Sequence, residues 1–128
     1  MEPMLSILFL LNFLKFIDIK EEDKKYFHIY FNDNKKKENE NTSLYKDDNV
    51  SKISIIIDYQ IKSFSELFCF CKCIESIEFK KFYRNNVINM NGMFYGCSSL
   101  KELNLNNFNN NNVTNMSCMF SGSLEDLI

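Results

Sequence analysis

NNVINMNGMFYGCSSLKELNLNNFNNNNVTNMSCMF, which spans residues 85–120, contains one motif twice at a separation of 26 residues. The recurring residues are Val87, Asn89, Met90, Met93, Phe94 and Gly96, which return as Val113, Asn115, Met116, Met119, Phe120 and Gly122. A period of this length is typical of proteins that stack one small unit on the next. The sequence therefore predicts a repeat architecture, whose usual role is to present a surface to a partner.

A degenerate copy of the motif precedes the clear one. When the register is carried back by 26 positions, apolar residues still fall on apolar positions, although the polar residues have changed. Repeats that share a buried core are expected to vary in this way. The apolar positions of this copy are Phe64, Leu67, Phe68, Cys71, Ile74, Ile77, Phe79 and Phe82. We divide the repeat region 61–128 into a degenerate copy (61–86), a clear copy (87–112) and a truncated copy (113–128).

Each copy is predicted to contain a strand and a short helix. Leu103 and Leu105 alternate with polar residues, which is the period of a half-buried strand. Val87, Met90 and Met93 follow one another at intervals of three residues, which places them on one face of a helix. Such a unit buries its apolar side only by stacking on its neighbours. The expected fold class is therefore an α/β repeat.

The repeat region resembles the BspA-like leucine-rich-repeat family, whose unit reads NVTNMxxMFxxCxxLxxLxLxxFNT. The stretches NNVTNMSCMF and MFYGCSSLKELNLNNFNNNNVTNM carry the resemblance, and the period is the same. The resemblance implies a short, right-handed leucine-rich-repeat-like solenoid with a parallel sheet along one side. It also implies a surface or secreted protein that binds other proteins, matrix or host cells.

The amino-terminal segment 1–20 is predicted to be an apolar helix. Residues 4–17 read MLSILFLLNFLKFI, and Pro3 suits the first turn of a helix. The run is shorter than the roughly 20 residues of a membrane span, and Glu2 replaces the basic start of a signal peptide. A helix that caps the apolar end of the stack is the favoured interpretation. A secretion signal and a membrane anchor are the alternatives.

Residues 21–60 are predicted to form a β-type lead-in to the repeats. The runs KKYFHIYF (24–31) and VSKISIIIDYQI (50–61) are rich in the aromatic and β-branched residues that strands favour. We expect the two runs to pair as an antiparallel ribbon. Residues 32–49 are polar, charged and without periodicity, which predicts a solvated loop.

Composition argues against an enzyme, a cofactor and a nucleic-acid partner. The formal net charge is −2 without a basic cluster on the repeats, so nucleic-acid binding lacks its electrostatic basis. The 3 glycines are too few for a glycine-rich phosphate loop. His28 is the only histidine and lies among aromatic residues, where a packed or partly exposed side chain is more common than a catalytic one. The expected role is non-catalytic.

The five cysteines are the best candidates for special chemistry. Cys69, Cys71 and Cys73 form a C-x-C-x-C run, and Cys97 lies in register with Cys71 one repeat later. Zinc sites prefer ligand pairs in C-x₂-C spacing. Equivalent side chains in a ladder point the same way, which is poor geometry for a disulfide. Buried thiols are therefore favoured, with a disulfide second and zinc third.

The predicted interaction face consists of the exposed polar positions on and beside the strands. These positions are Glu75, Ser76, Glu78, Lys80, Lys101, Glu102, Asn104 and Asn106. The expected function is a non-catalytic module that binds an unknown protein through this face. The alternative is a truncated end-piece of a longer repeat protein, with a structural role and no ligand of its own.

Two further expectations concern association and location. The last copy leaves an apolar edge, which predicts self-association unless a partner covers it. A membrane is expected to be a partner only if residues 4–17 form an anchor. The sequence leaves the compartment open: the resemblance favours the cell surface or secretion, and the weak signal-peptide features are compatible with the cytoplasm.

Overall fold

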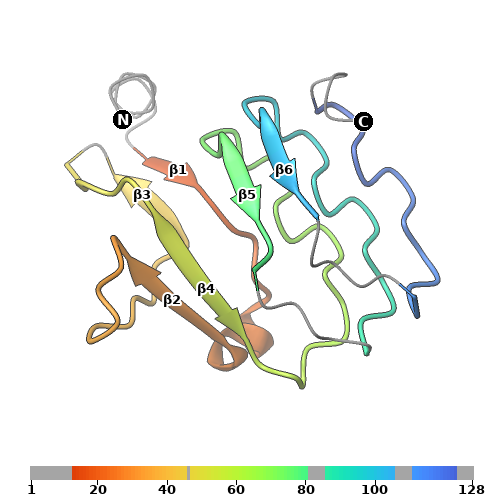
Figure 1. Cartoon of the computed structure of the whole chain (residues 1–128), viewed down its shortest axis with the longest axis horizontal. Helices are drawn as coiled ribbons and strands as arrows, with labels where there is room; N and C mark the ends of the chain where they lie inside the picture. Colours follow the sequence, from red (N-terminus) through yellow and green to blue (C-terminus); the bar gives the residue numbers. More distant parts are fainter. Residues whose placement is uncertain (1–12, 46, 81–85, 106–110, 124–128) are drawn as a thin grey trace.

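A computed structural model of the chain shows three turns of the repeat side by side, with a strand-rich lead-in at one end of the stack (Figure 1). The structure describes residues 13–45, 47–80, 86–105 and 111–123. We call the described parts of residues 61–86, 87–112 and 113–123 coil 1, coil 2 and coil 3. The lead-in is everything described before residue 61.

The lead-in contains the predicted antiparallel pair. Strand β2 (Phe27–Phe31) pairs with β4 (Ile53–Ile57), so that Phe27 lies opposite Ile57 and Phe31 lies opposite Ile53. A 3₁₀-helix, η1 (Glu21–Tyr26), leads into β2. The long connection between the two strands did not prevent the pairing, because apolar side chains from both strands contact the core.

Residues 32–49 were expected to be a loop throughout, and this prediction is wrong at one point. Strand β3 (Ser43–Tyr45) lies in the stretch and pairs in antiparallel orientation with β1 (Phe13–Lys15). Leu44, in the middle of β3, is buried in the core. A single buried residue in a polar stretch produces no periodic pattern from which a strand could be predicted. In the structure, the burial of Leu44 holds β3 in place.

The predicted apolar helix over residues 1–20 is also wrong in its described part. Phe13–Lys15 is strand β1, and the first helix in the described chain is η1, which begins at Glu21. The backbone groups of β1 bond to β3 instead of to a helical turn. Residues 1–12, which hold most of the apolar run, lie outside the described residues. Within the described ranges, no helix has the length and apolar character needed to cross a membrane.

The segment that follows β1 covers the first coil. Phe16 and Ile17 are buried in the core. The Asp18 N–H donates to the Leu67 carbonyl oxygen at 2.7 Å, and the Cys73 thiol lies 3.4 Å from the Lys15 carbonyl oxygen. An extended segment thus covers the end of the stack where the sequence predicted a capping helix.

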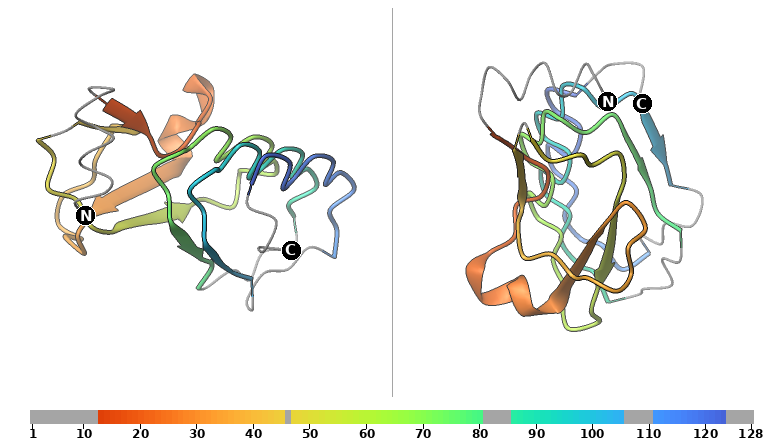
Figure 2. Two further views of the ribbon diagram at one scale, coloured as in Figure 1. Left: turned by 90° about the horizontal axis from the view of Figure 1, so that it is seen from above. Right: turned by 90° about the vertical axis from the view of Figure 1, so that its left-hand side faces the viewer.

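The predicted solenoid of strand-plus-helix units is wrong, because the described parts of the coils contain strands and turns but no helix. Strand β5 (Ser76–Glu78) in coil 1 pairs in parallel with β6 (Glu102–Asn104) in coil 2. The places where a helix was expected are consecutive turns at 65–70, 91–96 and 117–122. Figure 2 (left) shows these zigzag segments side by side, with β5 and β6 on the opposite side of the stack. We call them the turn ribbons.

Two interleaved sets of hydrogen bonds explain why no helix forms. Within coil 1, the Leu67 N–H donates to Phe64 and the Cys69 N–H donates to Glu66, each three residues back. The N–H group between these two, that of Phe68, donates to the next coil, to the Met93 carbonyl oxygen at 2.9 Å. An α-helix needs every N–H to donate four residues back along its own chain. The ribbon uses half of its donors for the neighbour instead.

The backbone hydrogen bonds between the turn ribbons all run in one direction, whereas elsewhere the coils bond to each other in both directions. The N–H groups of Phe64, Glu66, Phe68 and Phe70 donate to carbonyl oxygens 25 residues further along, and those of Met90, Gly92, Phe94 and Gly96 do the same. As a result, peptide groups of successive coils form continuous lines of hydrogen bonds along the stack. One such line starts at the Asp18 N–H of the lead-in, passes through Leu67–Phe68 and Met93–Phe94, and reaches the Met119 carbonyl.

Left-handed backbone conformations recur at two positions in each ribbon. The residues with positive φ in the ribbons are Glu66, Phe70, Gly92, Gly96, Cys118 and Gly122, two sets related by 26 residues. Each interrupts a right-handed helix. At Gly96 the lack of a side chain is also required for space, because a Cβ there would lie 2.5 Å from Cδ1 of Phe70. The glycines of the clear copy were therefore a signal against a helix.

The core runs along the stack as columns of equivalent residues. The ring of Phe94 stacks on Phe68 with centroids 5.9 Å apart, and on Phe120 with centroids 5.6 Å apart. Met90 and Met93 of coil 2 are completely buried. The apolar spacing of three residues, which resembles a helix face in the sequence, places these side chains inside a ribbon of turns.

Candidate functional site

The predicted interaction face is assembled by the parallel pairing of β5 and β6. Ser76 lies beside Glu102, and Glu78 lies beside Asn104. All seven of its described residues are exposed, namely Glu75, Ser76, Glu78, Lys80, Lys101, Glu102 and Asn104. Asn106 lies outside the described residues. The 26-residue register thus brings residues from two copies onto one continuous polar surface, which we call the strand face.

Contacts across the strand face fix its geometry. The Lys101 N–H donates to the Glu75 carbonyl oxygen at 2.8 Å, which continues the parallel ladder beyond β6. The Asn104 side-chain amide donates to the Glu78 carboxylate at 3.5 Å, and Lys80 lies 3.7 Å from the same carboxylate. Ile77 and Leu103, between the polar residues, pack against the core. The strand face therefore carries both positive and negative side chains, and its backbone is anchored to the core by Ile77 and Leu103.

Three cysteines of the repeat region, Cys71, Cys73 and Cys97, are buried thiols, and all five cysteines in the chain are free. Cys71 and Cys97 have no exposed surface, and the Cys97 thiol donates to the Phe68 carbonyl oxygen at 2.9 Å. Burial raises the pKa of the Cys97 and Cys73 thiols to about 11 and raises the pKa of Cys71 further. These three groups are protonated at neutral pH, and only the thiolate is a nucleophile or a metal ligand.

Metal ligands do not gather elsewhere in the described residues either. No group of three or more His, Cys, Asp or Glu side chains within 13–45, 47–80, 86–105 and 111–123 is placed to hold an ion. Cys118 is exposed, whereas its counterparts at the same ribbon position are Glu66 and Gly92. Within the C-x-C-x-C run, Cys71 and Cys73 are buried in the core and Cys69 is partly exposed.

His28 forms a contact that the sequence did not predict. Its Nδ1 lies 2.8 Å from a Glu38 carboxylate oxygen, and its Nε2 lies 3.0 Å from an Asp58 carboxylate oxygen. The hydrogen bond to Asp58 raises the pKa of His28; burial opposes the rise, and Glu38 adds to it. Both ring nitrogens are engaged, so the imidazole connects β2 to Glu38 in the following loop and to Asp58, the residue after β4.

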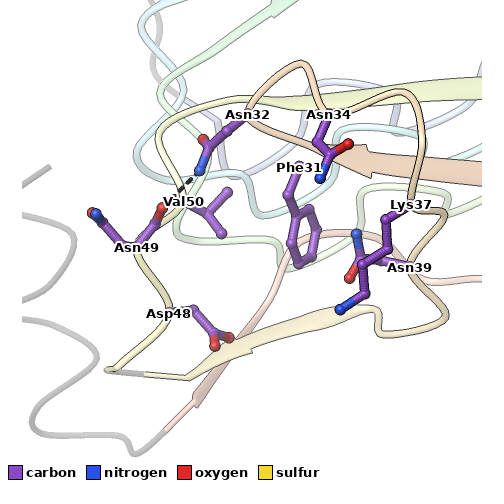
Figure 3. A pocket seen from close by; sticks show the side chains of 8 residues that line it. All are labelled: Phe31, Asn32, Asn34, Lys37, Asn39, Asp48, Asn49 and Val50. Carbon is purple, nitrogen blue, oxygen red and sulfur yellow. Dashed lines mark hydrogen bonds between the residues drawn. The ribbon is translucent and has the colours of Figure 1, made fainter.

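An open hollow of about 330 Å³ lies in the lead-in (Figure 3). Its lining residues are Phe31, Asn32, Asn34, Lys37, Asn39, Asp48, Asn49 and Val50. The Asn32 side chain spans the gap between two loops, because its amide donates to the Asn49 carbonyl at 2.7 Å and its oxygen accepts from the Ser51 N–H at 2.8 Å. These polar groups hold the loops together. The hollow lacks a nucleophile paired with a base.

Comparison with known proteins identifies one family. The model of a family described as "Mycoplasma protein of unknown function, DUF285" matches residues 25–125. This range includes the β2–β4 pair and all three described coils. No curated protein and no solved structure matches the chain.

Proposed function

The chain belongs to this family of Mycoplasma proteins of unknown function, and from that premise we propose that it is a non-catalytic protein-binding module built from BspA-like repeats. The match over residues 25–125 supports a repeat protein of this general kind. The motif NNVTNMSCMF supports the assignment to BspA-like repeats. The proposed binding surface is the strand face.

One observation carries the proposal: seven polar residues from two coils are exposed together on a regular pair of strands. Mixed charges on a fixed surface provide specificity through complementary potentials and steer the encounter with a partner. The face carries the carboxylates of Glu75, Glu78 and Glu102 and the amines of Lys80 and Lys101. A protein surface with alternating charges is the partner that this pattern suits.

The test compares two charge swaps that leave the net charge unchanged. In the first variant, Lys101→Glu is combined with Glu102→Lys on the strand face. In the second, Asp33→Lys is combined with Lys52→Glu; these residues form a salt bridge of 3.0 Å in the lead-in, which the swap restores in reverse. Proteins captured by the immobilised chain from an extract of surface and matrix proteins are then titrated against both variants.

We expect at least one captured protein to lose binding to the strand-face variant and to keep binding to the lead-in variant. Loss of about 1–3 kcal/mol in binding free energy is the expected scale for a central charged contact. If every captured protein binds both variants as tightly as the native chain, the strand face is not the binding surface.

A structural role is the second candidate, and the state of coil 3 favours it. Val113 and Phe120 are only partly buried, whereas their equivalents Val87 and Phe94 in coil 2 are buried. A coil with a partly exposed core is expected in a protein that forms part of a larger array. This candidate predicts that no specific partner of the strand face is captured.

A further inference from the structure

The open hollow in the lead-in has a polar lining whose charges balance (Figure 3). Four of the eight described residues that line it are asparagines, and the two charged ones are Lys37 and Asp48. One of these side chains is positive at neutral pH and the other is negative. An anion such as phosphate would be attracted by the amine but repelled by the carboxylate. The lining therefore favours a ligand that is polar and carries no net charge.

Several polar groups in the lining are available to such a ligand. Within the described residues, the side chains of Lys37, Asn39 and Asn49 form no hydrogen bond or ion pair. One carboxylate oxygen of Asp48 accepts from the Tyr45 N–H at 2.8 Å, and the other has no partner in the described chain. Asn39 and Asp48 are only partly exposed, so these groups line the hollow instead of extending into solvent. The hollow thus offers hydrogen-bond donors and acceptors together.

Hydrogen bonds hold both walls of the hollow in place before any ligand arrives. On one wall, the Asn39 N–H donates to the Ile29 carbonyl oxygen of β2 at 2.7 Å. On the other wall, the Asn32 side-chain amide donates to the Asn49 carbonyl oxygen at 2.7 Å, and its oxygen accepts from the Ser51 N–H at 2.8 Å. A ligand that enters a fixed surface loses less binding free energy to the ordering of loops.

An apolar surface lies between the polar groups. Figure 3 shows the Phe31 ring between Val50 on one side and Asn39 on the other. Phe31 packs edge-on against Phe16 of the core with ring centroids 5.9 Å apart, yet it remains partly exposed and lines the hollow. The face of an aromatic ring is negative and attracts the C–H bonds of a ligand. The matching ligand therefore has hydroxyl groups as well as C–H surfaces.

We propose that this hollow binds a neutral carbohydrate through Lys37, Asn39, Asp48 and Asn49. Each asparagine amide pairs a donor with an acceptor, which matches neighbouring hydroxyl groups that both donate and accept. Lys37 supplies a further donor and Asp48 a further acceptor. The site contains no residue of the strand face, so it is independent of the protein binding proposed above.

An NMR titration of the full chain tests the proposal. The chain is labelled with ¹⁵N and titrated with lactose, maltotriose, mannobiose and diacetylchitobiose. We expect at least one sugar to shift the side-chain amide signals of Asn39 and Asn49 and the backbone signals around them, with a dissociation constant on the order of 1 mM. Asn39→Ala removes a ligand contact but keeps the backbone bond to β2, and it is expected to weaken binding at least about fivefold.

Asn41→Ala is the matched control, because Asn41 is exposed in the same connection but does not line the hollow. It is expected to bind as tightly as the native chain. If Asn39→Ala does not fold, Lys37→Met replaces it with the same expectation. The proposal is overturned if none of the four sugars shifts the lining residues, or if Asn41→Ala weakens binding as much as Asn39→Ala. It is also overturned if inorganic phosphate or glycylglycine shifts the same signals at a lower concentration than every sugar.

Discussion

Three of the left-handed positions in the turn ribbons carry a side chain, and one of them is Glu66, whose equivalent in coil 2 is Gly92. A left-handed conformation costs a residue other than glycine roughly 1–2 kcal/mol. We therefore expect Glu66→Gly to stabilise the chain by about 0.5–1 kcal/mol, after the greater freedom of glycine in the unfolded chain is subtracted. Urea unfolding measures the change.

Lys62→Gly is the matched control for this prediction. Lys62 is exposed in the same coil but is not among the residues with positive φ. Glycine at position 62 relieves no backbone strain and loses more conformational entropy on folding than lysine does. Lys62→Gly is therefore expected to destabilise the folded chain by about 0.5–1 kcal/mol. Equal losses for the two variants would mean that residue 66 is not strained.

The thiols differ enough in burial to be distinguished by their reactivity. Cys118 is exposed, whereas Cys71 and Cys97 have no exposed surface and a raised pKa. An alkylating reagent at neutral pH is expected to modify Cys118 first, and Cys71 and Cys97 only after unfolding. Mass spectrometry of peptides after timed labelling gives the order. Early labelling of Cys97 in the folded chain would contradict the packing described for coil 2.

At the scale of single elements, the lead-in contains a titrating contact. His28 in β2 lies between Glu38 and Asp58, and its pKa is raised. A raised pKa in the folded state means that the stabilisation is fully present below the ordinary value of about 6.5. It is lost as the pH rises through the higher value of the folded state. The melting temperature is therefore expected to fall as the pH increases from about 6 to about 8.

Two variants check the origin of this pH dependence. His28→Gln removes the only histidine in the chain and is expected to flatten the curve in this range. Asp58→Asn removes the larger cause of the shift, so that the fall in melting temperature moves to lower pH. An unchanged curve in His28→Gln would assign the dependence to other groups.

The elements show which signals in the sequence are decisive. The 26-residue register correctly placed Ser76 beside Glu102, because equivalent residues of stacked units become neighbours. The β2–β4 pair was predictable from aromatic and β-branched runs. The absence of a helix from the coils was not predictable from this spacing. Met90 and Met93 are spaced as on a helix face, but a run of turns buries them equally well. Only Gly92 and Gly96, with their left-handed conformation, distinguish the two.

Strands β1 and β3 could not be predicted from the sequence pattern. Each has three residues, and their pairing joins segments that are about thirty positions apart in the sequence. Tertiary packing decides such short strands. The contact between His28 and Asp58 is of the same kind, since nothing in the sequence relates two residues that the β2–β4 register brings together. The strand face followed directly from the repeat, whereas this contact did not.

For the whole molecule, the lead-in and the coils are expected to unfold together. Phe16 is 2% exposed, packs edge-on against Phe31 and lies next to the segment that bonds to coil 1. Phe16→Ala is expected to cost about 3–5 kcal/mol, in a single transition. Phe70→Ala, at a side chain that is 53% exposed, is expected to cost under about 1 kcal/mol. Thermal unfolding followed by circular dichroism compares them; two separate transitions in the native chain would show that the coils fold independently.

The shared direction of the bonds between the turn ribbons has an electrostatic consequence. Peptide groups lined up head to tail add their dipoles, as they do along an α-helix. In an ordinary sheet the contributions of neighbouring peptides largely cancel. Here the N–H ends of the Asp18–Phe68–Phe94 line all point toward coil 3, so the turn-ribbon side of the stack has its positive pole at coil 3 and its negative pole at the lead-in. This polarity is opposite to that of a helix, in which the positive pole lies at the amino terminus.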